Sequence, residues 1–203
     1  MDPFIERITT PGFVVFAALL LGVAVARVAE LVVARRHTGA AKARGASPQR
    51  EPAFAFMVAL HTLPFWLAPL EVVGLHRPFL PSLAVGSGAL LVLAASLRYW
   101  TLRTLGARWN VRIVKPDRVV TRGPYAWLRH PNYLVVIVEL LALPLVHSAY
   151  LTAALLTVAN AVVLGFRIPA EERVLFEVPG YAEAMAHKPR LFPRLPLFSP
   201  GRH

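Results

Sequence analysis

Long apolar runs dominate the pattern of hydrophobic and polar positions along this chain. Five of them meet or approach the roughly 20 residues that a helix needs to cross the hydrocarbon core of a bilayer. They cover residues 13–33, 53–73, 79–102, 133–146 and 150–166. The last two are short and nearly touch, so we expect a helical hairpin that turns at His147 and Ser148. The pattern therefore predicts an all-α integral membrane protein with about five transmembrane helices.

The composition supports a membrane protein over a soluble one. Charged residues make up 16% of the chain and hydrophobic residues 56%, whereas a soluble domain carries about 25% charged residues. A soluble bundle with these helices buried would have too little polar surface to cover itself. A cleaved signal peptide is also disfavoured, because Asp2, Glu6 and Arg7 precede the first run and do not form a positive flank.

The basic residues predict which side of the membrane each connection faces. Of the 22 lysines and arginines, 19 follow the first span, lie in the last part of the third span or between it and the fourth, or follow the fifth. Because basic residues accumulate on the cytosolic side, we expect the N-terminus outside and the C-terminus in the cytosol. The Ala- and Arg-rich composition indicates a bacterial cytoplasmic membrane. The net charge of +11 reflects these flanks and contact with anionic lipids, and no nucleic-acid motif is present.

Two connections between the spans carry structural signals. Residues 38–52 contain Gly, Ala, Ser and Pro among several charges, which predicts a loop. Residues 109–114 and 118–121 have β character on either side of the turn signal Lys115-Pro116-Asp117. A small cytosolic β-hairpin is therefore expected before the fourth span.

The region after the fifth span turns amphipathic. Pro179-Gly180 divides residues 168–187 into two short helices, and the proline-rich tail 189–200 is expected to run extended along the membrane surface. The chain contains no cysteine, which excludes disulfides, thiolate metal sites and a cysteine nucleophile. No other metal site is predicted.

One candidate for chemistry is the sequence Arg129-His130-Pro131-Asn132-Tyr133 at the mouth of the fourth span. It offers a cation, an imidazole, an amide and a phenol. Anchoring at the headgroup level would explain Arg129 and Tyr133, and Pro131 suits the first turn of a helix. Anchoring explains His130 and Asn132 poorly, which favours a functional site.

A second candidate follows the fifth span, where Arg167 precedes Glu171 and Glu172. Arg167 and Glu171 are four residues apart and share one face of a helix. A guanidinium group can bind a carboxylate through two parallel hydrogen bonds. An ion pair at the end of a helix explains the same residues equally well.

Polar residues inside the spans form a third group, because such side chains are costly in a bilayer unless they find partners. They are Arg27, Glu30, His61, Glu71, Glu139 and Asn160. Arg27 and Glu30 are three residues apart and are expected to pair. Glu139 requires a partner or a polar cavity. Asn160 is expected to join helices or to line a cofactor pocket. His61 and Glu71 are candidates to line a substrate cavity, although packing between helices is favoured for His61.

These residues together resemble a known family. The pattern consists of Arg122-Gly123-Pro124-Tyr125, Arg129-His130-Pro131-Asn132-Tyr133, Asn160, Arg167 with Glu171-Glu172, Tyr181 and Arg190-Leu191-Phe192-Pro193. It resembles the isoprenylcysteine carboxyl methyltransferase family, which includes small bacterial relatives. The resemblance implies methyl transfer from S-adenosylmethionine. It also implies a methyltransferase core in residues 106–203, with a cytosolic cofactor-binding region, and three transmembrane helices on the substrate side in residues 1–105.

The resemblance also implies roles for individual residues. Those expected to hold S-adenosylmethionine are Arg129, His130, Tyr133, Asn160, Glu172 and Tyr181. Arg167 and Glu171 are expected to be catalytic, nearest to the transferred methyl group, and His61 and Glu139 to lie on the substrate side.

The acceptor stays open between two classes of lipophilic molecule. A carboxylate such as prenylcysteine is already ionised and needs an arginine to orient it. A phenol or enol, as in an alkylresorcinol or alkylpyrone, must lose a proton to a base such as Glu171 or His130. Ala34-Arg35-Arg36, His61 and Glu71 resemble relatives that methylate alkylpyrones and alkylresorcinols, which puts prenylcysteine in doubt.

Two other functions compete with methyl transfer. An NADPH-dependent membrane reductase of the sterol-reductase type shares the Arg129–Tyr133 motif, and the signature at Arg167 and Glu171-Glu172 favours the methyltransferase over it. In a non-enzymatic membrane protein, the same polar residues would be interfacial anchors.

Overall fold

The computed structural model describes residues 3–46, 48–49, 51 and 54–192, and within them every regular element is helical. The α-helices are α1 (Pro3–Ile8), α2 (Pro11–Ala43), α3 (Phe54–Thr62), α4 (Pro64–Gly74), α5 (Pro81–Leu105), α6 (Pro131–Leu145), α7 (Tyr150–Leu175) and α8 (Tyr181–Met185). Two 3₁₀ turns, η1 (Gly106–Arg108) and η2 (Gly123–Ala126), lie between α5 and α6. The predicted all-α fold is confirmed.

The long helices match the predicted spans. Four helical segments of the described chain are long and apolar enough to cross a membrane: α2, α3 together with α4, α5 and α7. The second is interrupted at Leu63, because Pro64 lacks the backbone N–H that would continue the helix. The fifth, α6, is a predominantly apolar helix of 15 residues and is ~22 Å long, which is shorter than the ~30 Å hydrocarbon core.

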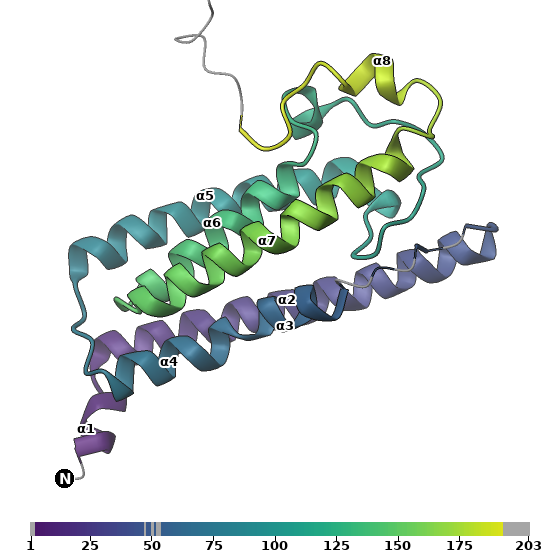
Figure 1. The fold of residues 1–203 in the computed structure, drawn as a ribbon. Helices are drawn as coiled ribbons and strands as arrows, with labels where there is room; N and C mark the ends of the chain where they lie inside the picture. Colours follow the sequence, from purple (N-terminus) through teal and green to yellow (C-terminus); the bar gives the residue numbers. More distant parts are fainter. Residues whose placement is uncertain (1–2, 47, 50, 52–53, 193–203) are drawn as a thin grey trace, which may run out of the picture.

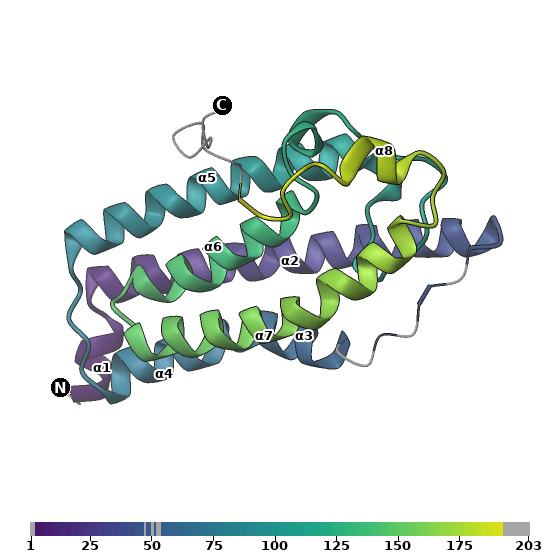
Figure 2. The same ribbon diagram turned by 45° about the horizontal axis from the view of Figure 1, so that its top comes forward.

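The helices form two layers that run in nearly the same direction (Figure 1). One layer holds α2, α3 and α4, and the other holds α5, α6 and α7. Helix α6 packs against both α5 and α7 and lies between them (Figure 2). The sides of α6 that face α5 and α7 are therefore covered by protein, and eight of its residues are buried.

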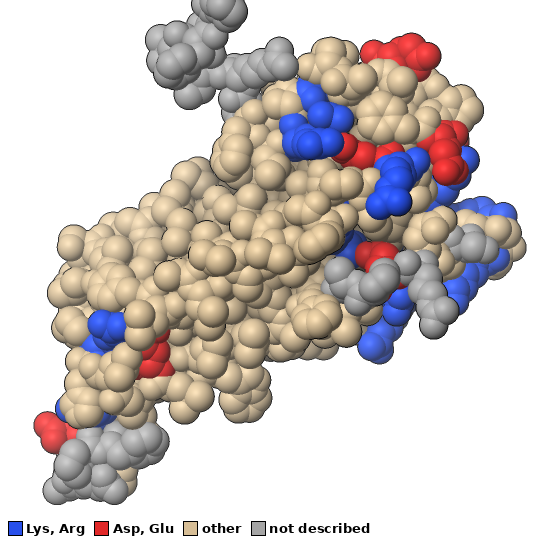
Figure 3. All heavy atoms as spheres, viewed as in Figure 1, with Lys and Arg blue, Asp and Glu red and all other residues tan. Residues whose placement is uncertain are grey.

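Apolar side chains cover the outside of the bundle. Val85 of α5 is 73% exposed, Leu93 of α5 67% and Val158 of α7 65%. A soluble monomer rarely exposes such a broad apolar surface, so lipid tails must cover it. Lys and Arg gather instead at the end that carries α8 and the C-terminal end of α2 (Figure 3). The protein is thus an integral membrane protein with one strongly basic end.

Buried charges join three helices inside the bundle. Arg27 and Glu30 of α2 form the predicted pair, with nitrogen and oxygen 2.9 Å apart. Arg98 of α5 donates two hydrogen bonds from Nε and Nη2 to the Glu30 carboxylate. Glu139 of α6 lies 3.6 Å from both arginines. Two cations and two anions therefore balance one another, which lowers the cost of placing charge in a bilayer.

The predicted helical hairpin is confirmed, since α6 ends at Leu145 and α7 begins at Tyr150. Two predictions about the connections were wrong. Helix α2 continues to Ala43, so the first part of the predicted loop at 38–52 is helical. The predicted hairpin at 109–121 is an irregular loop without strands. Of the predicted extended tail 189–200, residues 193–200 lie outside the described part of the chain.

The loop at 109–121 has a physical reason to remain irregular. Groups from other segments satisfy its backbone in place of a paired strand. The Ile113 N–H donates to Glu51 Oε1 at 2.8 Å, and the Gln49 N–H donates to the Ile113 carbonyl at 2.9 Å. The imidazole Nδ1 of His37 in α2 donates to the Trp109 carbonyl at 2.8 Å. The loop is therefore attached to α2 and to the segment that follows it.

Glu71 of α4 anchors the start of α7 at the end of the bundle opposite α8. Its Oε1 accepts the Leu151 N–H at 3.0 Å, and its Oε2 accepts the Thr152 N–H at 2.6 Å. Arg77 donates to the same carboxylate at 2.9 Å. The first N–H groups of a helix have no partner within the helix, so Glu71 supplies acceptors that α7 would otherwise lack. Glu71 therefore joins helices at this end and does not line a substrate cavity.

We expect Glu71→Gln to lower the free energy of unfolding by about 1–3 kcal/mol, because an amide replaces one acceptor oxygen and the charge. Unfolding in detergent, followed by circular dichroism, measures this effect. Glu183→Gln on the exposed face of α8 is the matched control. Equal unfolding midpoints for the two variants would contradict a capping role for Glu71.

Candidate active site

The candidate site lies where α6 begins and α7 ends, next to α8. Pro131 is the first residue of α6, so the motif around it places His130 just before the helix and Tyr133 in the first turn. Arg167, Glu171 and Glu172 lie in the last turns of α7. The two helices pack against each other, and their polar ends therefore meet.

A glycine shapes the turn that precedes α6. Gly123 begins η2 and has a φ of 59°, a value that residues with a Cβ rarely adopt. A Cβ at this position would lie 2.5 Å from the Thr104 Oγ1 of α5. Glycine therefore lets η2 pack closely on α5 and leads the chain into the site.

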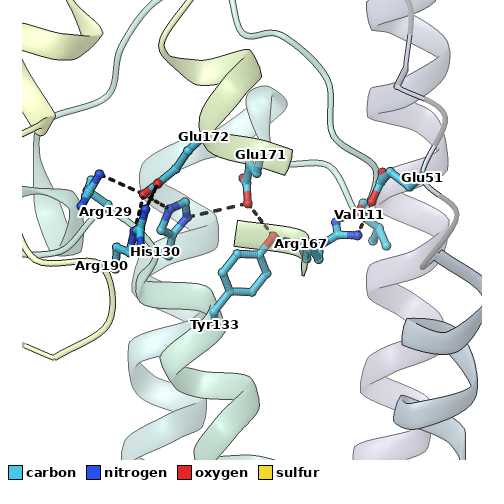
Figure 4. Close-up of polar contacts among 9 residues, drawn as sticks. All are labelled: Glu51, Val111, Arg129, His130, Tyr133, Arg167, Glu171, Glu172 and Arg190. Carbon is cyan, nitrogen blue, oxygen red and sulfur yellow. Dashed lines mark hydrogen bonds and ion pairs between the residues drawn. The ribbon is translucent and has the colours of Figure 1, made fainter. Parts of the chain in front are cut away.

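The buried carboxylate of Glu172 is the centre of an ion cluster (Figure 4). Arg129 Nη1 lies 2.9 Å from Glu172 Oε1, and Arg190 Nη2 lies 2.6 Å from Oε2. His130 Nε2 lies 3.1 Å from Oε1, and it carries the hydrogen of this bond because a carboxylate can only accept. The Arg190 guanidinium has its pKa raised by Glu172. Glu172 is thus surrounded by donors and is not available as a base.

The segment around Arg190 also pairs with the start of α6 through its backbone. The Arg129 N–H donates to the Pro189 carbonyl, and the His130 N–H donates to the Arg190 carbonyl, both at 2.9 Å. Together with the ion cluster, these bonds fix the segment after α8 across the entrance to α6.

Glu171 lies in a different environment from its neighbour. Its Oε2 accepts a hydrogen bond from the Tyr133 hydroxyl, and its side chain is 29% exposed, compared with 7% for Glu172. Tyr133 in turn accepts a hydrogen bond from Arg167 Nε at 2.8 Å. Tyr133 therefore links the two residues, and Arg167 does not bind Glu171 directly as the spacing suggested.

The Arg167 guanidinium is held by three groups of the protein. Besides Tyr133, it donates from Nη1 to Glu51 and from Nη2 to the Val111 carbonyl (Figure 4). Glu51 lies between α2 and α3, and Val111 lies in the loop after η1. Arg167 thus ties both halves of the chain to α7.

A cavity of about 400 Å³ connects these groups with the interior of the bundle. Its wall extends from Tyr181 of α8 past Glu171 and Asn160 to His61 of α3 and Phe65 of α4. His61 donates from Nδ1 to the Met57 carbonyl at 2.7 Å, because a carbonyl can only accept. The cavity therefore has a polar end at α8 and a course between the helices that is mostly apolar but passes the charged side chains of Arg27, Glu30 and Arg98.

Burial keeps two phenols at the polar end uncharged. Burial in the protein, with Glu171 nearby, raises the pKa of Tyr125 and that of Tyr181. Both side chains are therefore neutral hydrogen-bonding groups at physiological pH.

The structure brings most of the predicted site residues to this one cavity. Its wall includes Arg129, His130, Tyr133, Asn160, Arg167, Glu171, Tyr181 and His61. Two predicted residues do not line it: Glu172 lies in the ion cluster behind His130, and Glu139 lies among the buried charges of α2 and α5. The roles that the sequence suggests for these residues remain predictions.

Sequence reasoning missed Glu51 and Val111. Glu51 is one charge in a stretch that reads as a linker, and the Val111 contact is made by its backbone, so neither side chain carries a signal. Arg190 was part of the motif, but its partner Glu172 is 18 residues away and not predictable from spacing.

Comparisons with known proteins match this chain to a family. The model of the isoprenylcysteine carboxyl methyltransferase family matches residues 87–177, which include all of α6. The uncharacterized protein YpbQ of Bacillus subtilis (strain 168) is 38% identical over 164 residues, which are 80% of this chain and 97% of YpbQ.

Two further relatives and one solved structure match over smaller shares of their length. The cobalt-zinc-cadmium resistance protein CzcN of Cupriavidus metallidurans is 31% identical over 53% of this chain and 52% of its own. The nickel-cobalt-cadmium resistance protein NccN of Alcaligenes xylosoxydans xylosoxydans is 31% identical over 48% of each chain. A solved eukaryotic intramembrane Ras methyltransferase has 20% identity and a TM-score of 0.49 over 67% of this chain and 52% of its own. The chain spans about half the length of these three proteins.

The match to the family model includes the first turn of α6 and the last turns of α7, where Tyr133, Arg167 and Glu171 meet. YpbQ extends the similarity over nearly its whole length. The chain therefore belongs to the isoprenylcysteine carboxyl methyltransferase family of membrane methyltransferases.

Proposed function

We propose that the protein is an S-adenosylmethionine-dependent O-methyltransferase acting on a lipophilic molecule that carries a phenol or enol hydroxyl. The observation that carries the proposal is the contrast between Arg167 and Glu171. Arg167 donates to three groups of the protein, whereas Glu171 lines the cavity and accepts a hydrogen bond from Tyr133. The site thus offers Glu171 as a base for a hydroxyl acceptor, whereas the guanidinium group of Arg167 is already engaged.

The residues at the polar end of the cavity fit S-adenosylmethionine. Within the described part of the chain, Arg129 Nε, Asn132 Oδ1 and the Tyr181 hydroxyl are buried without a hydrogen-bond partner, and all three residues line the cavity. Buried polar groups normally have partners, and the carboxylate, ammonium and ribose hydroxyls of this cofactor would supply them. The bound cofactor supplies an electrophilic methyl group on sulfur.

The rest of the cavity suits a lipophilic acceptor. Beyond the polar end, its wall includes Phe65, Val136 and Leu164, which can cover an alkyl chain. The acceptor would enter from the bilayer and the cofactor from the basic end. That end faces the cytosol in the orientation that the basic residues predict. Membrane lipids are the other expected partners.

The proposed chemistry requires the acceptor to lose a proton. As the acceptor oxygen forms its bond to the methyl carbon, the carbon–sulfur bond breaks and the hydroxyl proton passes to the Glu171 carboxylate. The products are a methyl ether, S-adenosylhomocysteine and protonated Glu171. Tyr133 orients the carboxylate, and Arg167 holds Tyr133 in place. Positioning of the two reactants supplies much of the rate in such a displacement.

The alternatives receive less support. A carboxylate acceptor needs an arginine whose charge is not already paired, whereas each nitrogen of Arg167 already donates one hydrogen bond and its charge is paired with Glu51. A membrane reductase shares the motif at the start of α6, but the family is one of methyltransferases. A non-enzymatic membrane protein would have no use for a cavity that joins unpartnered polar groups to an apolar interior.

We expect the purified protein to bind S-adenosylhomocysteine and not NADPH in calorimetric titrations. Tyr181→Phe should weaken this binding about threefold to tenfold, because one hydrogen bond contributes about 0.5–1.5 kcal/mol. Tyr150→Phe, at the opposite end of α7, is the control and should bind as tightly as the wild type. Binding of NADPH alone would contradict the proposed function.

Replacement of the proposed base gives a separate test. Glu171→Gln should reduce methylation of a pentadecylresorcinol by roughly 10²–10⁴-fold, the usual contribution of a general base. Affinity for S-adenosylhomocysteine should remain within about threefold of the wild type, since the amide keeps the shape of the side chain. Glu183→Gln is the control for handling and expression. Undiminished turnover in Glu171→Gln would remove the base from the mechanism.

A further inference from the structure

Glu51 belongs to the site although it lies outside residues 87–177, which the family model matches. Its side chain is 7% exposed. Its Oε1 accepts the Ile113 N–H at 2.8 Å, and its Oε2 pairs with Arg167 Nη1. Both carboxylate oxygens are therefore occupied, and Figure 4 shows Glu51 on the side of Arg167 away from Glu171.

Described residues on both sides of Glu51 make backbone hydrogen bonds. The Gln49 N–H donates to the Ile113 carbonyl at 2.9 Å, and the Phe54 N–H donates to the Glu51 carbonyl at 3.1 Å. The loop that it contacts is held in turn by α2, where the Thr38 hydroxyl donates to Asn110 Oδ1 at 3.0 Å. The Glu51 carboxylate therefore has a defined position, as a group with a specific task requires.

Glu51 pairs with the charge on Arg167 that an acceptor carboxylate would need. A guanidinium group binds a carboxylate through parallel N–H groups, and one N–H of Nη1 already donates to Glu51 while one N–H of Nη2 donates to the Val111 carbonyl. A second carboxylate here would also meet the charge of Glu51, and like charges placed together disfavour a complex strongly. A neutral hydroxyl meets no such repulsion.

We propose that Glu51 determines acceptor specificity, by neutralising Arg167 and rejecting carboxylate acceptors in favour of neutral hydroxyls. This inference rests on the proposed methyltransferase function. It assigns the selection of the acceptor to Glu51, which lies outside the C-terminal half of the chain. Specificity of this kind depends on a repulsive group as much as on an attractive one.

The test compares two acceptors in the wild type and in Glu51→Gln. The amide keeps an oxygen for the Ile113 N–H and removes the charge. Methyl transfer from radiolabelled S-adenosylmethionine is measured to a pentadecylresorcinol and to N-acetyl-S-farnesylcysteine, a lipophilic carboxylate. The wild type should prefer the phenol by at least ~100-fold in kcat/KM, and Glu51→Gln should raise kcat/KM for the carboxylate by at least ~10-fold.

Two further variants show whether the gain depends on the geometry described. Glu177→Gln, which removes an exposed carboxylate paired with Lys115, should leave the acceptor preference at the wild-type value. Adding Arg167→Met to Glu51→Gln should abolish the gained carboxylate activity, because the freed guanidinium is what binds the acceptor. Carboxylate activity that persists in the double variant would overturn the assignment.

The outcomes separate this inference from the function on which it rests. A wild type that methylates neither acceptor contradicts the proposed function. A wild type that methylates the phenol, with a Glu51→Gln variant that binds S-adenosylhomocysteine but keeps the same preference, contradicts the role of Glu51 alone. If Glu51→Gln does not fold, inhibition of wild-type phenol methylation by farnesylcysteine decides the matter. Weak inhibition by the carboxylate supports its rejection by the site. Inhibition at the same concentration at which the phenol saturates the enzyme overturns the proposed role of Glu51.

Discussion

The interaction on which the site depends is the three-way hold on the Arg167 guanidinium. It joins α7 to α6 through Tyr133, to the loop after α5 through the Val111 carbonyl, and to the segment after α2 through Glu51. A buried guanidinium group is tolerated when its donors and its charge are satisfied. The bonds that lower the cost of burying Arg167 therefore also set the relative positions of four segments that are distant in sequence.

The bilayer imposes a second constraint, which explains where polar groups are found. Between the basic end and the opposite end of the bundle, Arg27, Glu30, Arg98 and Glu139 balance one another. At the end opposite α8, Glu71 satisfies the first turn of α7. Polar groups without partners among the described residues include Arg129 Nε, Asn132 Oδ1 and the Tyr181 hydroxyl, all beside the cavity. In the same described part of the chain, buried polar atoms without hydrogen-bond partners also occur at Arg27, Arg98, His147, Ser148 and Thr157, so the position of these three groups at the polar end of the cavity is what points to a binding site.

Much of this arrangement could be predicted from the sequence, because membrane spans and motif residues leave local signals. The five apolar runs and the turn at His147 and Ser148 follow from hydropathy, and the motif at the start of α6 identified His130 and Tyr133. The irregular course of residues 109–121 could not be predicted, because side chains such as Glu51 replace the strand partner that β-like residues suggested. Glu139 was placed with the substrate because its partners, Arg27 and Arg98, come from two other helices.

The backbone pairing of Arg129 and His130 with Pro189 and Arg190 has a consequence for biosynthesis. The chain leaves the ribosome in order, so all five spans are made before the segment around Arg190. Until that segment arrives, Glu172 lacks one of its cations and the start of α6 lacks two backbone partners. A nascent chain can therefore insert its helices before the segment around Arg190 completes the contacts of Glu172 and of the start of α6.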